Sequence, residues 1–285
     1  MRVDIGGGTR LFFDSVGAGL EADADELRAK PVLLVLHGGP GSDHSVFRPW
    51  FDRFADTHQV VYLDHRGQGR SDERRDPTGW DLDTWADDIV RFCDALGIEK
   101  PIVLGQSFGG FVALHYAGRH PDHPGGLVLS STAARDHVGP TLDAFERLGG
   151  AEAREVAARF WSGTATPEEM LRYDEVCTPL YNQRAVEDPD AKRRVWANHR
   201  VLFHFITGEH LTFDLRPDLA AVACRTLVLA GVDDPVCPVP VYDEMVEILT
   251  GAGVDVESHL FEDCGHGSYR DQPDETERVL RAWLR

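Results

Sequence analysis

The sequence lacks hydrophobic runs long enough to cross a membrane. Apolar runs such as Val32–Leu36 have only the length of a strand, whereas a membrane-spanning helix needs about 20 predominantly apolar residues. The N-terminal segment MRVDIGGGTR also lacks the apolar core of a secretory signal. We therefore expect a cytoplasmic protein that has no membrane partner.

Cysteine is scarce, and no two cysteines have the spacing of a CxxC motif. The five cysteines are odd in number, which argues against a disulfide framework and against a structural zinc site. Cys237 and Cys264 stand close in the sequence to two residues discussed below, Asp234 and His266, and a metal trio with His266 is conceivable. That histidine has a better use, argued below, so reduced and packed thiols are the preferred interpretation. The cysteines are Cys93, Cys177, Cys224, Cys237 and Cys264.

Basic residues are outnumbered by acidic ones, 29 against 48, and the formal net charge is -19. A field of that sign repels phosphate backbones, so nucleic acid is excluded as an expected partner. Repeats and low-complexity segments are also absent. A chain of 285 residues can nevertheless bury a large core.

Continuous apolar runs alternate with amphipathic segments in the first half of the chain and again near its end. Strands that are apolar on both faces are typical of a parallel sheet buried between helices. The pattern predicts strands at residues 32–36, 59–64, 101–105, 126–130, 226–231 and 256–261, and helices at residues 84–96, 241–249 and 274–284. One arm of an N-terminal hairpin is expected at residues 10–16, and a surface loop or short helical turn at residues 19–30.

Strand-like runs are missing between residues 133 and 215, where the pattern becomes helical and rich in aromatics. Helical stretches are expected at residues 141–148, 151–161 and 167–177, the last with proline in its first turn. The sequence therefore predicts an α/β core formed by residues 1–132 and 216–285, with a helical cap, residues 133–215, inserted into it.

A serine stands in a tight turn between a predicted strand and a predicted helix. The pentapeptide Gly105-Gln106-Ser107-Phe108-Gly109 follows an apolar run and precedes the helical FVALHYA. Glycines on both sides of the serine allow such a turn to close, because a side chain there would clash with neighbouring backbone. The context favours Ser107 as a nucleophile exposed at the carboxyl edge of the sheet.

A serine hydroxyl needs a base, and the base needs a carboxylate that fixes its tautomer. On such a sheet the expected chain order is serine, acid, histidine. Asp233 and Asp234 follow the strand at residues 226–231, and His266 follows the last strand between two glycines. The sequence alone does not decide whether Asp233 or Asp234 is the acid. We choose Asp234, because it directly precedes Pro235, which would stiffen the loop.

Backbone donors for an oxyanion are expected at two places. His37-Gly38-Gly39-Pro40-Gly41 follows a buried strand, and we assign one donor to the N–H group of Gly39 and the other to that of Phe108. The segment 64–71, DHRGQGRS, could resemble a phosphate cradle, but it lacks the required spacing. We interpret it as scaffolding, with Asp64 and Arg66 as loop anchors.

Together, HGGPG, DHRGQGRS, GQSFGG, GVDDPVCP and CGHG resemble the α/β-hydrolase superfamily, and more narrowly its proline iminopeptidase group (peptidase family S33). The resemblance runs from about residue 31 to the C-terminus. It implies the α/β-hydrolase fold, the triad Ser107, Asp234 and His266, and Gly39 as an oxyanion donor.

Two departures from that group concern the elbow and the cap. The group shows Gly-Gly-Ser-Trp-Gly where this chain has Gly-Gln-Ser-Phe-Gly, and its cap glutamates hold the amino terminus of the substrate. Matching through residues 205–208 puts Phe203 at the place of such a glutamate. Possible substitutes, each also explicable as a solvated charge, are Glu168, Glu169, Glu175 and Glu209.

The sequence therefore predicts a serine hydrolase that cleaves a small-molecule or short-peptide substrate, with a proline-iminopeptidase-like aminopeptidase preferred. A carboxylic-ester or lactone hydrolase is the alternative, and a non-catalytic ligand-binding protein on the same fold is a remote one. No metal or organic cofactor is implied.

Overall fold

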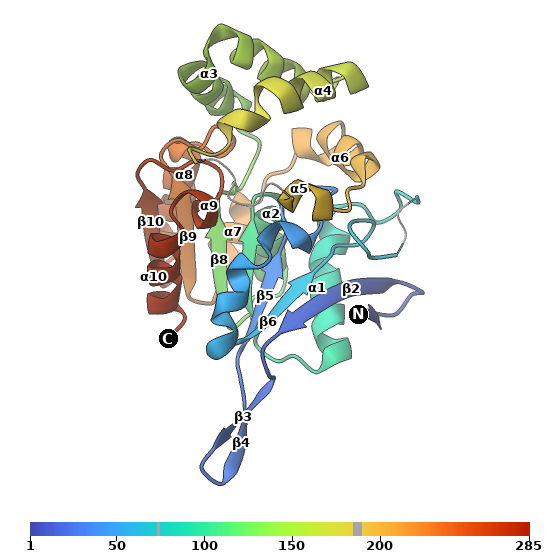
Figure 1. The fold of residues 1–285 in the computed structure, drawn as a ribbon, viewed down its shortest axis with the longest axis vertical. Coiled ribbons are helices and arrows are strands. Elements are labelled where there is room, and N and C mark those ends of the chain that lie inside the picture. Colours follow the sequence, from blue (N-terminus) through green and yellow to red (C-terminus); the bar gives the residue numbers. More distant parts are fainter. Residues whose placement is uncertain (73–74, 185–189) are drawn as a thin grey trace.

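An eight-stranded sheet runs through the centre of the protein (Figure 1). The computed structural model describes residues 1–72, 75–184 and 190–285. In spatial order the strands are β1 (Arg2–Asp4), β2 (Arg10–Val16), β6 (Gln59–Leu63), β5 (Val32–Leu36), β7 (Ile102–Gln106), β8 (Gly126–Ser130), β9 (Thr226–Gly231) and β10 (Val256–Phe261). The strands from β6 to β10 are parallel, and β1 and β2 are antiparallel. The predicted mostly parallel sheet is confirmed, and each of the six predicted strands is present to within one residue at either end.

Each central strand sends side chains into two separate cores. Leu34 and Leu36 of β5 join one core, and Leu33 and Val35 join the other. All four are fully buried, and each such side chain contributes about 1.5–3 kcal/mol relative to exposure. The first core lies under α1 (Leu82–Leu96), α2 (Phe108–Arg119), α7 (Arg216–Ala221) and α8 (Val239–Gly251); the second lies under η2 (Trp50–Asp56) and α10 (Pro273–Trp283).

Local capping chemistry explains where α1 begins and ends. The Asp81 side chain accepts a hydrogen bond from the backbone N–H of Thr84, which satisfies one of the free donors of the first turn. Gly97 ends the helix in the left-handed region, with φ 65°. The helix therefore begins two residues before the predicted Thr84.

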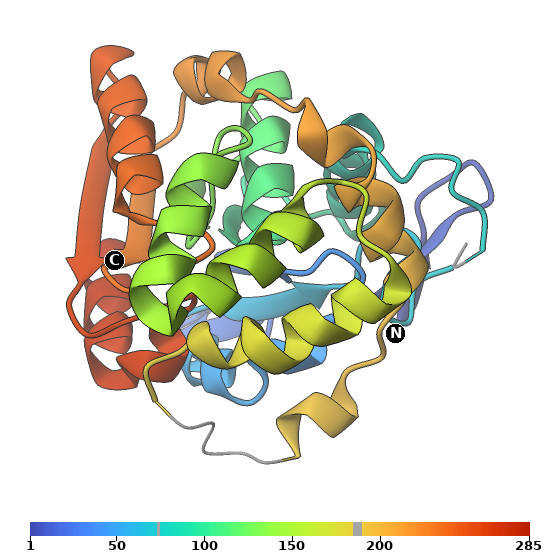
Figure 2. The same cartoon turned by 90° about the horizontal axis from the view of Figure 1, so that it is seen from above.

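The helices between residues 133 and 215 lie over the carboxyl edge of the sheet (Figures 1 and 2). They are α3 (Val138–Trp161), α4 (Pro167–Val176), η3 (Thr178–Leu180), α5 (Ala191–Arg194), α6 (His199–Ile206) and η4 (Glu209–Leu211). Gly150, with φ 76°, kinks α3 into the two pieces that the sequence predicts. We call these elements the cap; its boundaries at residues 132 and 216 stay a prediction. Within residues 1–72, 75–184 and 190–285, no helix combines the length and the apolar character that spanning a bilayer requires.

The prediction for residues 19–30 is wrong. They form a hairpin, β3 (Leu20–Asp23) paired with β4 (Glu26–Ala29), which extends away from the sheet (Figure 1). In its turn, Ala24 has φ 53°, a conformation that glycine or asparagine usually adopts. With either residue at that position, the sequence would have predicted a hairpin turn. The acidic, alanine-rich composition of the segment hid its strand character.

Candidate active site

The predicted nucleophile stands on a strained turn between β7 and α2. Ser107 has φ 56° and ψ -123°, values that a residue with a side chain rarely adopts. A Cβ added at Gly105 would overlap the backbone of Gly109, and one added at Gly109 would overlap the carbonyl of Leu36. The expectation that these two glycines allow the turn to close is confirmed.

The predicted base and its acid meet at the carboxyl ends of β9 and β10. His266 Nδ1 lies 2.8 Å from Oδ2 and 3.0 Å from Oδ1 of Asp234. Oδ1 of Asp234 also accepts hydrogen bonds from the backbone N–H groups of Val236 and Cys237, at 2.8 and 2.9 Å. The carboxylate is wholly buried and is oriented from both sides.

Ionisation of Asp234 is favoured in spite of its burial. Burial by itself raises the pKa of Asp234, but the charge and hydrogen bond of His266 and the N–H groups of Cys237 and Val236 bring it below its ordinary value. The neighbouring Asp233 instead forms a surface ion pair with Arg147, at 2.7 Å. The structure thus brings Asp234, and not Asp233, against the imidazole.

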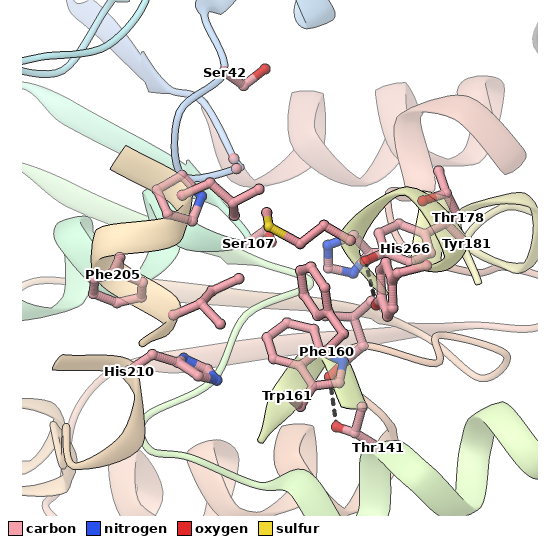
Figure 3. Close-up of a pocket in the computed structure, with 18 of the residues that line it drawn as sticks. Ser42, Ser107, Thr141, Phe160, Trp161, Thr178, Tyr181, Phe205, His210 and His266 are labelled. Atoms are coloured by element: carbon pink, nitrogen blue, oxygen red, sulfur yellow. Dashed lines mark hydrogen bonds between the residues drawn. The ribbon is translucent and has the colours of Figure 1, made fainter. Parts of the chain in front are cut away.

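Ser107 and His266 line one cavity of about 620 Å³ between the sheet edge and the cap (Figure 3). Tyr181 packs beside His266 with ring centroids 5.3 Å apart, and Phe205 lies on the far side of Ser107 (Figure 3). Most of the other lining side chains are apolar or aromatic, including Phe111, Phe160, Trp161, Met170, Leu171, Leu202, Ile206 and Val236. An apolar, partly enclosed cavity above the serine favours small substrates that carry an apolar group.

The glycine-rich loop after β5 touches the serine turn. A Cβ added at Gly38 would lie 3.2 Å from Ser107 Cβ and 2.7 Å from Gln106 Oε1. Gly39 also lines the cavity. In the described parts of the chain, no acceptor is hydrogen-bonded to the backbone N–H of Gly39 or of Phe108. Of the two predicted oxyanion donors, Gly39 lines the cavity, whereas Phe108 is buried directly behind Ser107.

Asp64 and Arg66 anchor loops, as the sequence predicts. Asp64 accepts hydrogen bonds from His44 Nδ1 at 2.7 Å and from the backbone N–H of Arg70 at 2.8 Å. Burial by itself raises the pKa of Asp64, but the hydrogen bond from His44 and the charges of nearby histidines lower it below the ordinary value. Arg66 forms a two-pronged ion pair with Asp88, at 2.6 and 2.7 Å.

The cap contributes polar groups that sequence reasoning missed. Among the described carboxylates, Asp136 and Asp174 line the cavity, whereas the four glutamates considered above do not. His210, also in the lining, has Nε2 3.7 Å from Asp136 Oδ1, and burial lowers the pKa of His210 to about 4. The imidazole is therefore neutral near pH 7 and does not compensate the charge of Asp136. Phe203 is 46% exposed and lies outside the lining.

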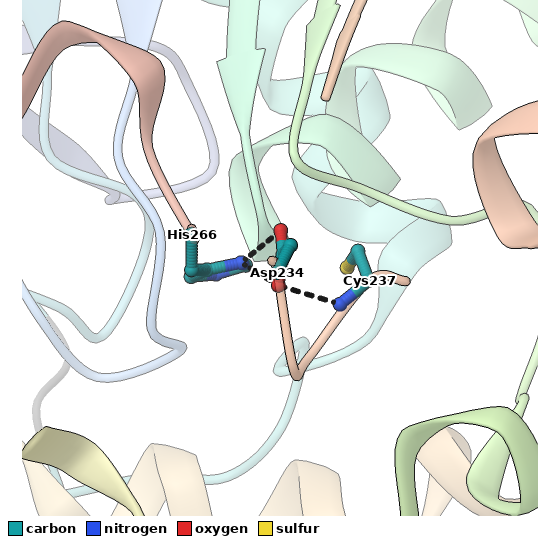
Figure 4. A group of neighbouring side chains, drawn as sticks. All are labelled: Asp234, Cys237 and His266. Carbon is teal, nitrogen blue, oxygen red and sulfur yellow. Dashed lines mark hydrogen bonds and ion pairs between the residues drawn. The ribbon is translucent and has the colours of Figure 1, made fainter. Parts of the chain in front are cut away.

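A possible metal cluster exists around the predicted acid. Donor atoms of Asp234, Cys237 and His266 lie within 4.8 Å of one another (Figure 4). However, burial and then the charge of Asp234 raise the pKa of the Cys237 thiol well above its usual range. Because the thiolate is the form that binds metals, this protonated thiol is better suited to packing. All five cysteines are free, and all but Cys224 are buried.

A family model described as the alpha/beta hydrolase fold matches residues 31–273, and the chain belongs to that family. Its sequence is similar to that of the proline iminopeptidase of Lactobacillus crispatus, with 28% identity over 271 residues and 90% of each chain covered. The expected resemblance to proline iminopeptidases is confirmed.

Two solved structures share the fold. The proline iminopeptidase of Mycobacterium smegmatis superposes with a TM-score of 0.75 at 22% identity and covers 100% of this chain and 97% of its own. An esterase from Exiguobacterium antarcticum gives a TM-score of 0.71 at 21% identity, covering 100% and 98%. The chain is therefore an α/β hydrolase with peptidase relatives and esterase neighbours.

Proposed function

We propose that the protein is a serine hydrolase that cleaves an amide or ester of a small substrate through an acyl-enzyme. The observation that carries this proposal is the common cavity of Ser107 and His266, with His266 held by a buried Asp234. Because the carboxylate accepts a hydrogen bond from Nδ1–H, the neutral imidazole carries its proton on Nδ1. Its Nε2 is then unprotonated, as a general base requires.

Each residue then has one role in the reaction. Ser107 Oγ attacks the substrate carbonyl carbon while His266 Nε2 takes the hydroxyl proton, and the carbonyl oxygen becomes an oxyanion held by the N–H groups of Gly39 and Phe108. His266 gives the proton to the departing amine or alcohol as the acyl-enzyme forms. Water, deprotonated by the same imidazole, then attacks the acyl carbon and releases the acid and the serine.

Within this class, we prefer an aminopeptidase that resembles the proline iminopeptidases. Asp136 supports it, because among the described residues no lysine or arginine is ion-paired with this carboxylate and the neighbouring His210 is neutral. The ammonium group of an aminoacyl substrate would supply a cation. Asp174, whose Oδ1 accepts the Thr178 hydroxyl at 3.1 Å, is a second carboxylate facing the same space.

Labelling by a fluorophosphonate probe tests the serine chemistry. The wild type should be labelled and Ser107→Ala should not, because the phosphorus is attacked by the activated hydroxyl. Labelling that persists in the variant would contradict the assignment of Ser107, because another residue would then be the nucleophile. A wild type that is never labelled would contradict the proposal and favour a non-catalytic ligand-binding protein.

A substrate panel separates the peptidase from the esterase or lactonase. Proline and alanine naphthylamides are compared with p-nitrophenyl acetate and butyrate, in the wild type and in Asp136→Asn. We expect the variant to raise KM for the aminoacyl substrates by about tenfold or more, the value of a charge-assisted hydrogen bond of about 1.5–3 kcal/mol, and to leave the esters unchanged. Asp143→Asn, an exposed change on α3, is the matched control. Equal effects on both substrate types would refute an amine-binding role for Asp136.

A further inference from the structure

Asp271 is a buried carboxylate that lies between the cap and the loop carrying His266. It ends α9 (Ser268–Asp271), five residues after His266, and has no solvent exposure. Its Oδ2 accepts hydrogen bonds from the backbone N–H of Gly265 at 2.8 Å and of Gln183 at 3.0 Å. Its Oδ1 accepts one from the backbone N–H of Arg184 at 3.1 Å.

Backbone dipoles, rather than a cation, compensate this charge. Throughout the described segments, no lysine or arginine side chain is ion-paired with Asp271. A buried carboxylate is costly unless its lone pairs are filled, and here three N–H groups and the Asn182 amide, at 3.4 Å, fill them. The donors come from two segments that are more than 80 residues apart in the chain. The carboxylate therefore holds these two segments together.

The same two segments also touch directly. The backbone N–H of His266 donates to the carbonyl of Tyr181 at 2.5 Å. A Cβ added at Gly265 would overlap that carbonyl, so only glycine allows this approach. Tyr181 itself stands in the cavity beside His266 (Figure 3). The cap segment 181–184 thus forms the immediate support of the base.

We propose that Asp271 is a positioning residue that fixes the cap segment 181–184 onto the loop of His266, so that the placement of the cap and the aim of the base are set together. This inference rests on the proposed function, in which His266 is the base. Loosening Asp271 should therefore slow turnover even for a substrate too small to need the cap.

The test is Asp271→Asn, compared with Asp263→Asn. Asparagine keeps the shape but has one acceptor oxygen. With that oxygen on the Gly265 and Gln183 N–H groups, its NH2 group faces the Arg184 N–H, which loses its acceptor. For p-nitrophenyl acetate we expect kcat to fall between about tenfold and a hundredfold at nearly constant KM, as for a displacement of up to about 1 Å of a reacting group. The rate of fluorophosphonate labelling should fall by the same factor. Asp263 is exposed on the same loop at φ 50°, which asparagine tolerates, so its variant should match the wild type.

Wild-type kcat and labelling in a folded Asp271→Asn variant would overturn the inference while leaving the proposed function intact, whereas an inactive, unlabelled wild type would overturn the proposed function itself. If Asp271→Asn does not fold, hydrogen exchange on the wild type decides. The side chains of Gln183 and Arg184 are exposed, so their amides exchange at loop rates unless the carboxylate protects them. We expect protection by at least about a hundredfold, shared with the Gly265 amide; unprotected amides at 183 and 184 would refute the proposal.

Discussion

The Asp234 carboxylate offers the sharpest test of the proposed chemistry, because only one of its two oxygens is held by backbone donors. Oδ1 accepts hydrogen bonds from the backbone N–H groups of Val236 and Cys237 and lies 3.0 Å from His266 Nδ1, whereas Oδ2 lies 2.8 Å from the same nitrogen. In Asp234→Asn the amide oxygen must stay with the two backbone donors, since a buried donor without an acceptor costs about 1–3 kcal/mol. The amide NH2 group then points at His266.

That orientation reverses the tautomer of the base. The NH2 group takes the oxygen position closer to Nδ1, at 2.8 Å against 3.0 Å. When Nδ1 accepts the amide hydrogen, the proton of the neutral imidazole moves to Nε2, the atom that is proposed to take the proton of Ser107. The loss for such a change in a serine triad is about 10⁴ in kcat, which is about 5.5 kcal/mol of transition-state stabilisation. We expect a fall of 10³–10⁴ in kcat for p-nitrophenyl acetate, on the order of this value, with little change in KM.

Asp233→Asn is the control that the chain itself provides. Its carboxylate pairs with the half-exposed Arg147, a contact worth about 0–1 kcal/mol, so kcat should stay within about twofold of the wild type. Steady-state kinetics on both variants, with circular dichroism to verify folding, give the comparison. If Asp233→Asn lost more activity than Asp234→Asn, the assignment of the acid would be refuted.

Three further substitutions test the loops and turns that support the site. Gly38→Ala, whose Cβ would lie 2.7 Å from Gln106 Oε1, should lower kcat by about tenfold or more at unchanged Tm. Gly109→Ala, whose Cβ would overlap the Leu36 carbonyl, should cost about 3 kcal/mol or more in urea unfolding. Because the folded state lowers the pKa of Asp64, its contribution is present above about pH 4 and is lost as the pH falls through that lowered pKa. Asp64→Asn should therefore flatten the fall in urea stability below about pH 4.

The sheet and the turn at Ser107 could be predicted because their signals are local. Val32–Leu36 is apolar at every position, and only a strand covered on both faces buries all of it. The placement of His266 and Asp234 follows by one step, because loops after parallel strands meet at one edge. In the structure the two residues are hydrogen-bonded, as that topology leads one to expect.

Contacts made across the chain have no local pattern. Asp136 and His210 are 74 residues apart in sequence, and nothing near either of them signals that both line one cavity. In the sequence, Asp271 is indistinguishable from an ordinary charged residue of a helix. Only the structure shows that it accepts hydrogen bonds from the segment 181–184. The cap is positioned by such tertiary hydrogen bonds, which periodicity cannot reveal.

Another cap residue, Asn198, contacts the glycine-rich loop that follows β5. The backbone N–H of Asn198 donates to the Gly41 carbonyl at 2.6 Å, and its side-chain amide donates to the Gly67 carbonyl at 2.7 Å. Gln68 Oε1 in turn accepts the Gly41 N–H at 2.6 Å. The cap is therefore anchored to the loop of His266 through Asp271 and to the glycine-rich loop through Asn198. If His266 is the base, as proposed, we expect a cap exchanged from a relative without these two anchors to lower turnover as well as to change substrate preference.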